Sequence, residues 1–318
     1  MEKVKVGVIG VGYLGKHHAR IYSEIERAQL VGVSDIDEGR GKEIASTYGT
    51  QFFSEPADLL ERVDAASIAV PSKHHYTLAK EALSKRVHTL VEKPIACSVE
   101  EASSLVELAR KNGTRLYVGH TERFSPPIVA LRERISCPLF IECHRLASFR
   151  QRGTDIAVVL DLMIHDIDIV LWLVRSPLEK VDAVGIPVLT EHEDIANARM
   201  EFASGCIANL TASRVSKGSL RKIRIFQKNE YISINSPGKS VEIYTRLLGE
   251  DGRPQVRREE VEVGGDEPLR AELEAFLEEI GEQEKTNLAT GEEGRDALVV
   301  AFKILQLIRE RRARIGIE

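Results

Sequence analysis

Cysteine is scarce in this chain of 318 residues, and the arrangement of the few cysteines argues against disulfides and structural metal sites. The four of them, Cys97, Cys137, Cys143 and Cys206, include no Cys-x-x-Cys pair and have no histidine partners at the spacing of a zinc site. Scattered cysteines of this kind are typical of reduced thiols in a cytosol. We therefore predict no disulfide and no structural metal.

Long hydrophobic runs and a strong excess of one charge are absent as well. No apolar run reaches the roughly 18 residues that a membrane span needs, and no apolar signal core precedes the first strand-like segment in MEKVKVGVIG. The 44 basic and 49 acidic residues leave a net charge of −5 that is spread along the chain. The overall field therefore favours neither DNA nor an anionic membrane, although a local basic patch is compatible with it. We expect a soluble, cytoplasmic protein without nucleic-acid or membrane partners.

The first 120 residues alternate short apolar runs with helix-length segments. The runs, rich in β-branched residues, lie at 4–10, 28–35, 65–70, 87–92 and 114–119, and helix patterns such as 17–25, 39–49 and 98–113 separate them. Strands that are apolar on both faces and alternate with helices form a parallel sheet with helices on both sides. The prediction is an α/β protein whose first domain, residues 1–120, is a Rossmann-type, doubly wound parallel sheet.

After the segment TERFSPP the pattern changes. A strongly apolar helix is predicted at 157–174, strands at 180–189, 196–215, 221–237 and 240–248, and helices at 266–283 and 292–312. Hydrophobic and polar residues alternate along these strands, which is typical of an antiparallel sheet with one covered face. The second domain, residues 121–318, is therefore predicted to be α+β.

The turn after the first strand carries a glycine triplet, Gly10, Gly12 and Gly15, in the pattern G-x-G-x-x-G. Glycine permits a tight turn in which backbone N–H groups approach a pyrophosphate at a helix N-terminus, although glycine clusters also make ordinary turns. The second strand ends at Asp35, about 20 residues further on, where an acid can accept the ribose hydroxyls of NAD and repel the 2′-phosphate of NADP. We predict NAD as the cofactor. Arg40 either offsets that repulsion in part or belongs to a solvated helix face.

Lys93 follows the fourth of these strands in the stretch HTLVEKPIA. Pro94 favours extended geometry at Lys93 and ends ladder pairing, so the lysine is expected to project from the strand's carboxyl end, where doubly wound sheets bind ligands. Glu92 is its natural partner. A surface ion pair at a strand end is the structural alternative.

Asp161, His165 and Asp168 stand at i, i+4 and i+7 in the apolar helix. At 100° per residue they share one face, and most of the other positions are apolar. Such a stripe needs either a polar cavity or mutual pairing. A substrate site and a core histidine capped by two carboxylates account for it equally well.

Together these motifs resemble the Gfo/Idh/MocA oxidoreductases, and the likeness covers essentially the whole chain. It rests on the glycine turn with His18, PSKHH ending at His75, EKP at 92–94, GHTERFSP at 119–126, D-x-x-x-H-x-x-D at 161–168 and EPL at 267–269. The resemblance implies that Lys93 and His165 are catalytic, that Asp161 helps to hold the substrate, and that an open-faced sheet in the second domain makes contacts in a homo-oligomer, a dimer or a tetramer. The cofactor-binding residues expected on this basis are Gly10, Gly12, Tyr13, Leu14, Gly15, Asp35, Pro71, His75, Glu92 and Lys93.

Four strings in the second domain, at 158–174, 193–202, 204–216 and 221–227, are similar more narrowly to UDP-N-acetylglucosamine 3-dehydrogenases, which precede amino-sugar formation for lipid A. Basic residues gather in two places, one at Arg145, Arg150 and Arg152 and the other at Arg214, Lys217, Arg221, Lys222 and Arg224. Arginine binds diphosphates well, but charges at a strand edge also oppose aggregation. The residues expected to bind substrate are Lys93, Arg123, Arg150, Asp161, His165 and Arg214.

The sequence thus predicts an NAD-dependent dehydrogenase that oxidises a secondary alcohol of a sugar, with C3 of UDP-N-acetylglucosamine as the expected position. His165 is expected to take the hydroxyl proton and Lys93 to stabilise the developing oxyanion, and the reverse assignment stays open. One alternative is a cyclitol or free-sugar dehydrogenase, which needs no diphosphate site. Another is a nonenzymatic NAD(H)-binding regulator.

Overall fold

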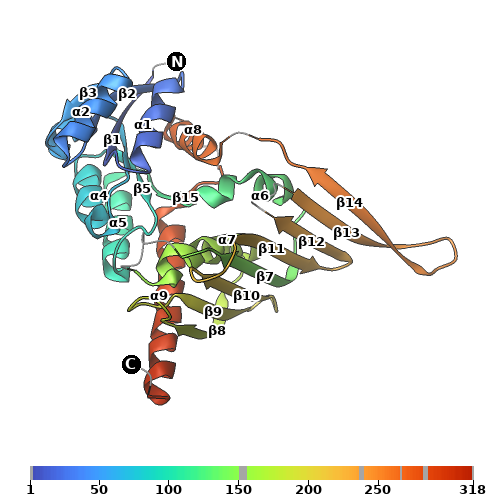
Figure 1. Ribbon diagram of the computed structural model, residues 1–318. Coiled ribbons are helices and arrows are strands. Elements are labelled where there is room, and N and C mark those ends of the chain that lie inside the picture. The colour runs from blue at the N-terminus through green and yellow to red at the C-terminus, as the bar shows by residue number, and fades with distance from the viewer. Residues whose placement is uncertain (1–2, 150–155, 236–239, 266, 282–285, 317–318) are drawn as a thin grey trace. The chain divides into compact units, whose positions relative to one another are not determined.

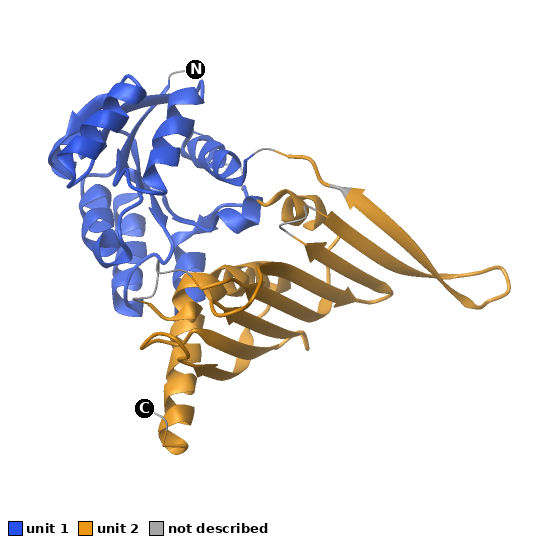
Figure 2. Cartoon of the chain, in the orientation of Figure 1, with its two compact units in different colours: residues 1–124, 266–298 blue, residues 125–265, 299–318 orange. Residues whose placement is uncertain are grey.

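The computed structural model describes residues 3–149, 156–235, 240–265, 267–281 and 286–316. The chain divides into two compact units (Figure 2). Within the described ranges, the first contains residues 1–124 and 266–298, and the second contains residues 125–265 and 299–318. Each unit has its own sheet and is described by itself.

The first unit is organised around a seven-stranded sheet with the strand order β15-β6-β5-β4-β1-β2-β3 (Figure 1). The strands are β1 (Val4–Ile9), β2 (Ala28–Ser34), β3 (Gln51–Phe53), β4 (Ala65–Ile68), β5 (His88–Glu92), β6 (Leu116–Gly119) and β15 (Ala289–Thr290). Strands β1 to β6 pair in parallel, and β15 pairs antiparallel with β6. The order changes direction between β1 and β4, which is where sheets of this kind bind ligands.

Helices follow the strands of this sheet. They are α1 (Gly15–Glu24), α2 (Glu38–Thr47), α3 (Pro56–Leu60), η1 (Ser72–His74), α4 (His75–Ser84), α5 (Val99–Asn112), η2 (Thr121–Phe124) and α8 (Pro268–Gly281). The ends of α5 show why the sequence folds this way. The Ser98 side chain accepts from the Glu101 N–H at 3.2 Å, and Gly113 takes the left-handed conformation, with φ of 66°, that ends the helix.

The core of the first unit joins segments that lie far apart in the sequence. Buried β-strand residues such as Val6, Val33 and Leu90 belong to the same hydrophobic cluster as Leu273 and Phe276 of α8. α8 and the start of α9 (Gly291–Arg314) therefore pack in the first unit, whereas the sequence prediction placed all of 121–318 in the second domain. Helical periodicity shows that a face is buried but not which partner covers it.

The second unit contains an eight-stranded sheet with the order β14-β13-β12-β11-β7-β10-β9-β8. The strands are β7 (Pro138–Leu146), β8 (Leu178–Ile186), β9 (Ile195–Phe202), β10 (Ile207–Ser213), β11 (Leu220–Gln227), β12 (Glu230–Asn235), β13 (Ser240–Leu248) and β14 (Pro254–Glu262). All neighbours are antiparallel except β7 and β10, which are parallel. The predicted fold class is confirmed, with β3, β7, β14 and β15 as unpredicted additions.

One face of this second sheet is covered by a helix. After the short α6 (Pro126–Leu131), the chain forms a π-helical turn, η3 (Val159–Met163), that continues into α7 (Ile164–Val174). α7 packs against β7 and β10. The burial of alternate residues, such as Ile141, Cys143 and Arg145 of β7, follows from this cover.

The other face of the sheet carries a row of aromatic rings across four strands. Phe140, Phe226, Tyr231 and Tyr244 follow one another with centroid distances of 5.6, 4.7 and 5.4 Å. The β13–β14 hairpin extends from this sheet (Figure 1), and Leu248 and Val256 near its tip are 72% and 71% exposed. The row makes this face only partly polar.

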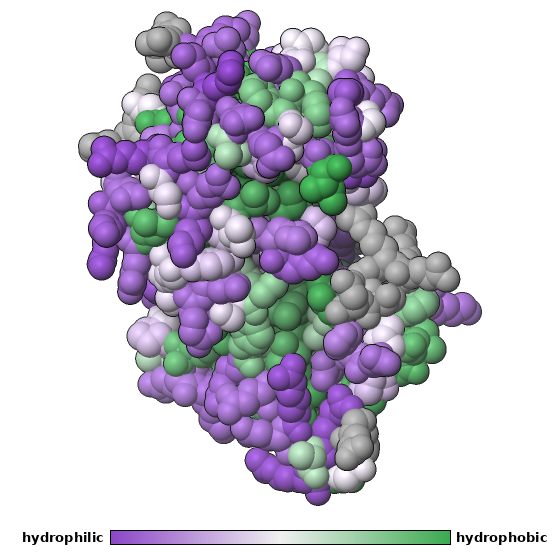
Figure 3. All heavy atoms as spheres, turned by 90° about the vertical axis from the view of Figure 1, so that its left-hand side faces the viewer, coloured by the Kyte–Doolittle hydropathy of each residue, from purple (hydrophilic) through white to green (hydrophobic). Residues whose placement is uncertain are grey.

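The surface view in Figure 3 shows hydrophobic residues in groups between hydrophilic ones. Among the described residues, no helix is long and apolar enough to cross a membrane. In the same ranges, no group of three or more His, Cys, Asp or Glu residues is arranged to hold a metal ion.

Candidate functional site

The glycine turn between β1 and α1 leaves no room for side chains at two of its three positions. Gly10 has a φ of +83°, and a Cβ there would lie 2.6 Å from Val70 Cγ1. A Cβ at Gly15 would lie 1.7 Å from the Gly10 carbonyl oxygen, so the start of α1 packs directly on the turn. Gly12, by contrast, has no neighbour within 4 Å of that position among the described atoms, and its backbone is open to a ligand.

The N-terminus of α1 suits an anion. Its N-cap residue, Leu14, makes no side-chain cap, and its first turn contains no acidic residue. The N–H groups at such an end, together with the helix dipole, favour a phosphate. Tyr13 beside it is 65% exposed. The turn and the helix therefore fit the pyrophosphate of a dinucleotide.

Asp35 lies just beyond β2 and is 8% exposed. Its carboxylate accepts from the backbone N–H groups of Val11 and Asp37, each at 2.8 Å. Burial alone raises the pKa of Asp35, but the Arg40 guanidinium and these N–H groups outweigh it and hold the pKa below its ordinary value. The ionised acid is thus fixed against the glycine turn, where it can accept ribose hydroxyls.

Lys93 directly follows β5, and both of its neighbours in the chain are held by buried imidazoles. Glu92, at 8% exposure, lies 3.1 Å from His18 Nε2, and His18 is 1% exposed. The Pro94 carbonyl oxygen lies 2.7 Å from His75 Nδ1. Burial raises the pKa of Glu92, but the hydrogen bond from His18 and nearby charges, including Lys93, bring it below the ordinary value. The carboxylate beside Lys93 therefore stays ionised.

Asp161, His165 and Asp168 lie in the second unit, in η3 and α7. Asp161 and His165 are partly exposed, whereas Asp168 is 1% exposed and the apolar positions around them are mostly buried. Asp161 belongs to the π-turn, whose wider spacing changes the angle that a regular α-helix would give it. Insertions of this kind are frequent at functional sites. The segment thus presents an acid and an imidazole at partly exposed positions, whereas its other two acids, Asp166 and Asp168, are buried.

Three arginines singled out in the sequence, one expected to bind substrate and two from the basic clusters, have protein partners. Arg123 is 1% exposed and donates to Glu293 at 3.1 Å. Arg145 is 5% exposed and forms a bidentate ion pair with Asp166, with contacts of 2.8 to 3.2 Å. Arg214, also 5% exposed, donates to the Ile156 carbonyl oxygen at 2.5 Å, and its Nε lies 3.8 Å from Asp194. These contacts hold each guanidinium within its own unit. Arg150 and Arg152 lie outside the described residues.

Strand alternation separates the remaining basic residues near β11. Arg221 pairs in register with Arg145, so it is on the face that α7 covers. Lys222 and Arg224 pair with His144 and Glu142 and belong to the opposite face, where Arg224 forms an ion pair with Glu142. Of this group, Arg221 is the exposed member on the α7 face.

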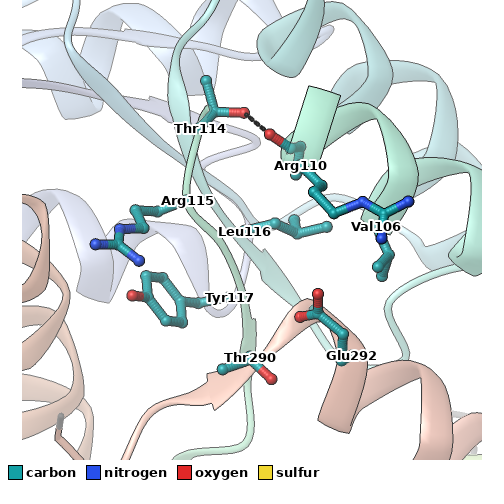
Figure 4. Close-up of a pocket in the computed structure, with 10 residues that line it drawn as sticks. Val106, Arg110, Thr114, Arg115, Leu116, Tyr117, Thr290 and Glu292 are labelled. Carbon is teal, nitrogen blue, oxygen red and sulfur yellow. Dashed lines mark hydrogen bonds between the residues drawn. The ribbon is translucent and has the colours of Figure 1, made fainter. Parts of the chain in front are cut away.

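Sequence reasoning did not assign a role to His18. Its only signal is its position three residues after the last glycine of the turn, which places it on the face of α1 toward β5. A small cavity of about 180 Å³ elsewhere in the first unit is formed by Val106, Ala109, Arg110, Thr114, Arg115, Leu116, Tyr117, Thr290, Gly291 and Glu292 (Figure 4). It includes none of the predicted site residues.

Two family models match this chain. The model described as an oxidoreductase family with an NAD-binding Rossmann fold matches residues 4–120, and the one for the GFO/IDH/MocA C-terminal domain matches residues 141–233. These ranges contain the glycine turn, Asp35 and Lys93 on one side, and the helix with Asp161 and His165 on the other.

Several characterised proteins are similar to the chain. The UDP-N-acetylglucosamine 3-dehydrogenase of Acidithiobacillus ferrooxidans is 38% identical over 306 residues, which is 96% of this chain and 97% of that protein. A solved structure of that enzyme superposes with a TM-score of 0.90 at 36% identity, covering 97% of this chain and 98% of the other. An inositol 2-dehydrogenase of Rubrobacter xylanophilus is 34% identical over 195 residues, or 58% of this chain and 56% of that protein.

Proposed function

The chain belongs to the Gfo/Idh/MocA family of NAD-binding oxidoreductases, and on that premise we propose that it oxidises C3 of UDP-N-acetylglucosamine. The observation that carries the choice of substrate is the similarity to a UDP-N-acetylglucosamine 3-dehydrogenase along nearly the whole of both chains. The inositol dehydrogenase matches a little over half of this chain, which supports a cyclitol substrate less well.

The residues of the first unit fit a bound NAD. The open backbone at Gly12, the close packing at Gly10 and Gly15, and the uncapped start of α1 would receive the pyrophosphate, with Tyr13 and Leu14 in the same turn. The ionised Asp35 would accept the ribose hydroxyls. Pro71 and Lys93 lie just past the ends of β4 and β5, at the cofactor edge of the sheet, and the buried His75 and Glu92 would support them.

The proposed chemistry is the removal of a proton and a hydride from a secondary alcohol. When bound, NAD supplies the acceptor for the hydride that leaves the carbon. His165 takes the hydroxyl proton, since an imidazole titrates near neutral pH, and the oxygen becomes the carbonyl of a ketone. Lys93 stabilises the negative charge that develops on that oxygen, and Asp161 holds the substrate. In the reverse assignment, Lys93 is the base and His165 stabilises the negative charge on the oxygen.

Arg221 is the residue we propose for the diphosphate of the substrate. Its side chain is exposed, and it lies on the same face of the sheet as α7, the helix that carries His165. Arg123 and Arg214, which the sequence suggested for substrate, are buried with protein partners and are better explained as structural. A guanidinium binds phosphate oxygens through two N–H groups at once.

We also propose that the second unit mediates assembly into a homo-oligomer. The face of its sheet opposite α7 carries the aromatic row from Phe140 to Tyr244, together with ion pairs such as that of Arg224 with Glu142. A face that combines apolar rings with both charge signs can pair with a second copy of itself.

Isotopic labelling tests the reaction position. UDP-N-acetylglucosamine deuterated at C3 should give deuterated NADH and turn over more slowly than the unlabelled substrate, whereas label at C4 should stay in the sugar. Transfer of deuterium from C4, or NADH without deuterium, would show that another carbon is oxidised.

A further inference from the structure

Lys93 is flanked by two residues that other elements hold in place, and all of the contacts lie within the first unit. Glu92, before it, is held through its carboxylate, and Pro94, after it, through its carbonyl oxygen. The two side chains that hold them, His18 and His75, are each 1% exposed. Neither histidine therefore has surface with which to touch a substrate.

The Glu92 carboxylate is confined from two directions. His18 Nε2 on α1 lies 3.1 Å from Glu92 Oε1. On the other side, a Cβ at Gly119 would lie 3.2 Å from Glu92 Cδ and Oε2, so the glycine at the end of β6 leaves just enough room for the carboxylate. A buried carboxylate needs a donor, because an unsatisfied buried charge is costly.

The proton on His18 can be placed from its surroundings. A carboxylate only accepts, so Nε2 carries the N–H that reaches Glu92. The other ring nitrogen, Nδ1, is buried and has no hydrogen-bond partner in the part of the chain that the structure describes. A buried N–H without an acceptor is costly, and the neutral ring with its proton on Nε2 avoids that cost.

His75 links two segments at the cofactor edge of the sheet. Its Nδ1 lies 2.7 Å from the Pro94 carbonyl oxygen and its Nε2 lies 2.8 Å from the Val70 carbonyl oxygen, just after β4. Carbonyl oxygens only accept, so the ring makes both contacts as a donor only when doubly protonated. Burial holds the pKa of His75 below its ordinary value, although the hydrogen bonds to the two carbonyls and the Glu92 charge act in the opposite direction. Falling pH therefore favours the form with two bonds.

From these contacts we propose that His18 and His75 are positioning residues that fix Lys93 through its two neighbours, Glu92 and Pro94. The inference rests on the proposed role of Lys93. α1, which carries His18, begins at the glycine turn, and His75 begins α4 after Pro71, so both histidines connect cofactor-binding segments to the lysine. A displacement of Lys93 by a fraction of an ångström is enough to weaken its contact with a developing oxyanion.

Paired substitutions test this with matched controls. An Asn amide nitrogen can take the place of histidine Nδ1, and a Gln amide nitrogen that of Nε2. For His18, which acts through Nε2, we expect His18→Gln to keep kcat near that of the unmodified enzyme and His18→Asn to lower it about tenfold. For His75, which reaches Pro94 through Nδ1, the order is reversed, so His75→Asn should be active and His75→Gln impaired by about tenfold.

Lys93→Met separates this proposal from the proposed function. In the Lys93→Met background, His18→Asn and His75→Gln should lower kcat no further, because the residue they position is already lost. Equal losses in all four histidine variants, or losses that persist in that background, would overturn the positioning role. Normal turnover in Lys93→Met itself would instead overturn the proposed function.

A measurement on the unmodified protein keeps the proposal testable where a variant does not fold. Nitrogen-15 spectra of the histidine rings at neutral pH should show His18 protonated at Nε2 and not at Nδ1, and His75 protonated at Nδ1. A His75 ring without a proton on Nδ1 has no bond to Pro94 and would contradict the proposal.

Discussion

Arg40 and Asp35 form an ion pair at the end of β2, with Arg40 Nη2 2.6 Å from Asp35 Oδ1 and Arg40 Nε 3.2 Å from Oδ2. Arg40 is the more exposed partner, at 42% of its side chain against 4% for Asp35. The acid that is predicted to select NAD is thus accompanied by a largely exposed cation. The pair therefore combines an element that repels a 2′-phosphate with one that attracts it.

Cofactor preference should follow from this pair. The unmodified protein is expected to bind NAD more tightly than NADP, and Asp35→Ala should narrow the difference because it removes the repulsion and releases Arg40. Each 1.4 kcal/mol of repulsion removed corresponds to about a tenfold change in the ratio of the two Kd values. Titrations with both cofactors measure it, with Arg40→Met as the control that should weaken NADP. Tighter binding of NADP by the unmodified protein would be inconsistent with the role of Asp35.

Lys93→Met and His165→Ala should each lower turnover by a factor on the order of a hundred or more. In the proposed mechanism the first substitution removes the charge that stabilises the oxyanion, and the second removes the base. Steady-state kinetics and NAD titrations measure the effect, and NAD should still bind. The exposed Lys73→Met and His192→Ala are matched controls. Loss of folding in His165→Ala would indicate that His165 is a core histidine. Normal turnover in either variant would exclude the substituted residue from catalysis.

Breaking the buried pair of Arg145 and Asp166 should destabilise the fold strongly. Arg145→Met leaves the Asp166 carboxylate, 2% exposed, without its guanidinium, and we expect the free energy of unfolding to fall by about 3–5 kcal/mol. Urea denaturation measures the loss, and adding Asp166→Leu should recover most of it. Lys42→Ala, which removes an exposed pair with Glu38, should change stability by less than about 1 kcal/mol. A similar loss of stability in Arg145→Met and Lys42→Ala would show that the burial of the Arg145–Asp166 pair is unimportant.

Acid should destabilise the protein through Asp194. Burial raises the pKa of this carboxyl, but N–H groups of Leu189, Val188 and Thr190 outweigh it and hold the pKa below its ordinary value. Because the pKa of Asp194 is lower in the folded than in the unfolded protein, its ionised carboxylate stabilises the fold. This stabilisation is fully present above the unfolded-state pKa, about 3.9, and is lost as the pH falls through the folded-state pKa. Asp194→Asn should therefore cost at least ~1.5 kcal/mol at pH 7 and progressively less below about pH 4. A cost that does not change with pH would contradict this.

The sequence predicts best where its pattern is local. The parallel strands, the glycine turn, Asp35 at the end of β2 and Lys93 after β5 all follow from short-range signals. β14 was not predicted because six of the nine residues in PQVRREEVE are polar or charged and its two valines lie five positions apart, so this edge strand shows no continuous apolar face. β3 and β15, with three and two residues, are too short to show a period.

Contacts between distant segments account for what the sequence did not predict at the site. Arg123 pairs with Glu293, 170 positions away, and Arg214 lies against Asp194 on a neighbouring strand end. An arginine in a sequence looks the same whether it binds a phosphate or a buried carboxylate. The basic cluster at 214–224 likewise divides between two faces only when the register of β11 with β7 is known.

Comparison of three substrates tests the central claim most directly. NADH formation should be measured with UDP-N-acetylglucosamine, free N-acetylglucosamine and myo-inositol under the same conditions. We predict that kcat/KM is highest for the UDP-sugar, by on the order of a hundredfold, because charge-assisted contacts to a diphosphate contribute about 1.5–3 kcal/mol each. Arg221→Met should reduce that advantage, whereas Lys222→Met, on the opposite face of the same strand, should not. Oxidation of free N-acetylglucosamine or myo-inositol as efficiently as the UDP-sugar would contradict the nucleotide-sugar assignment.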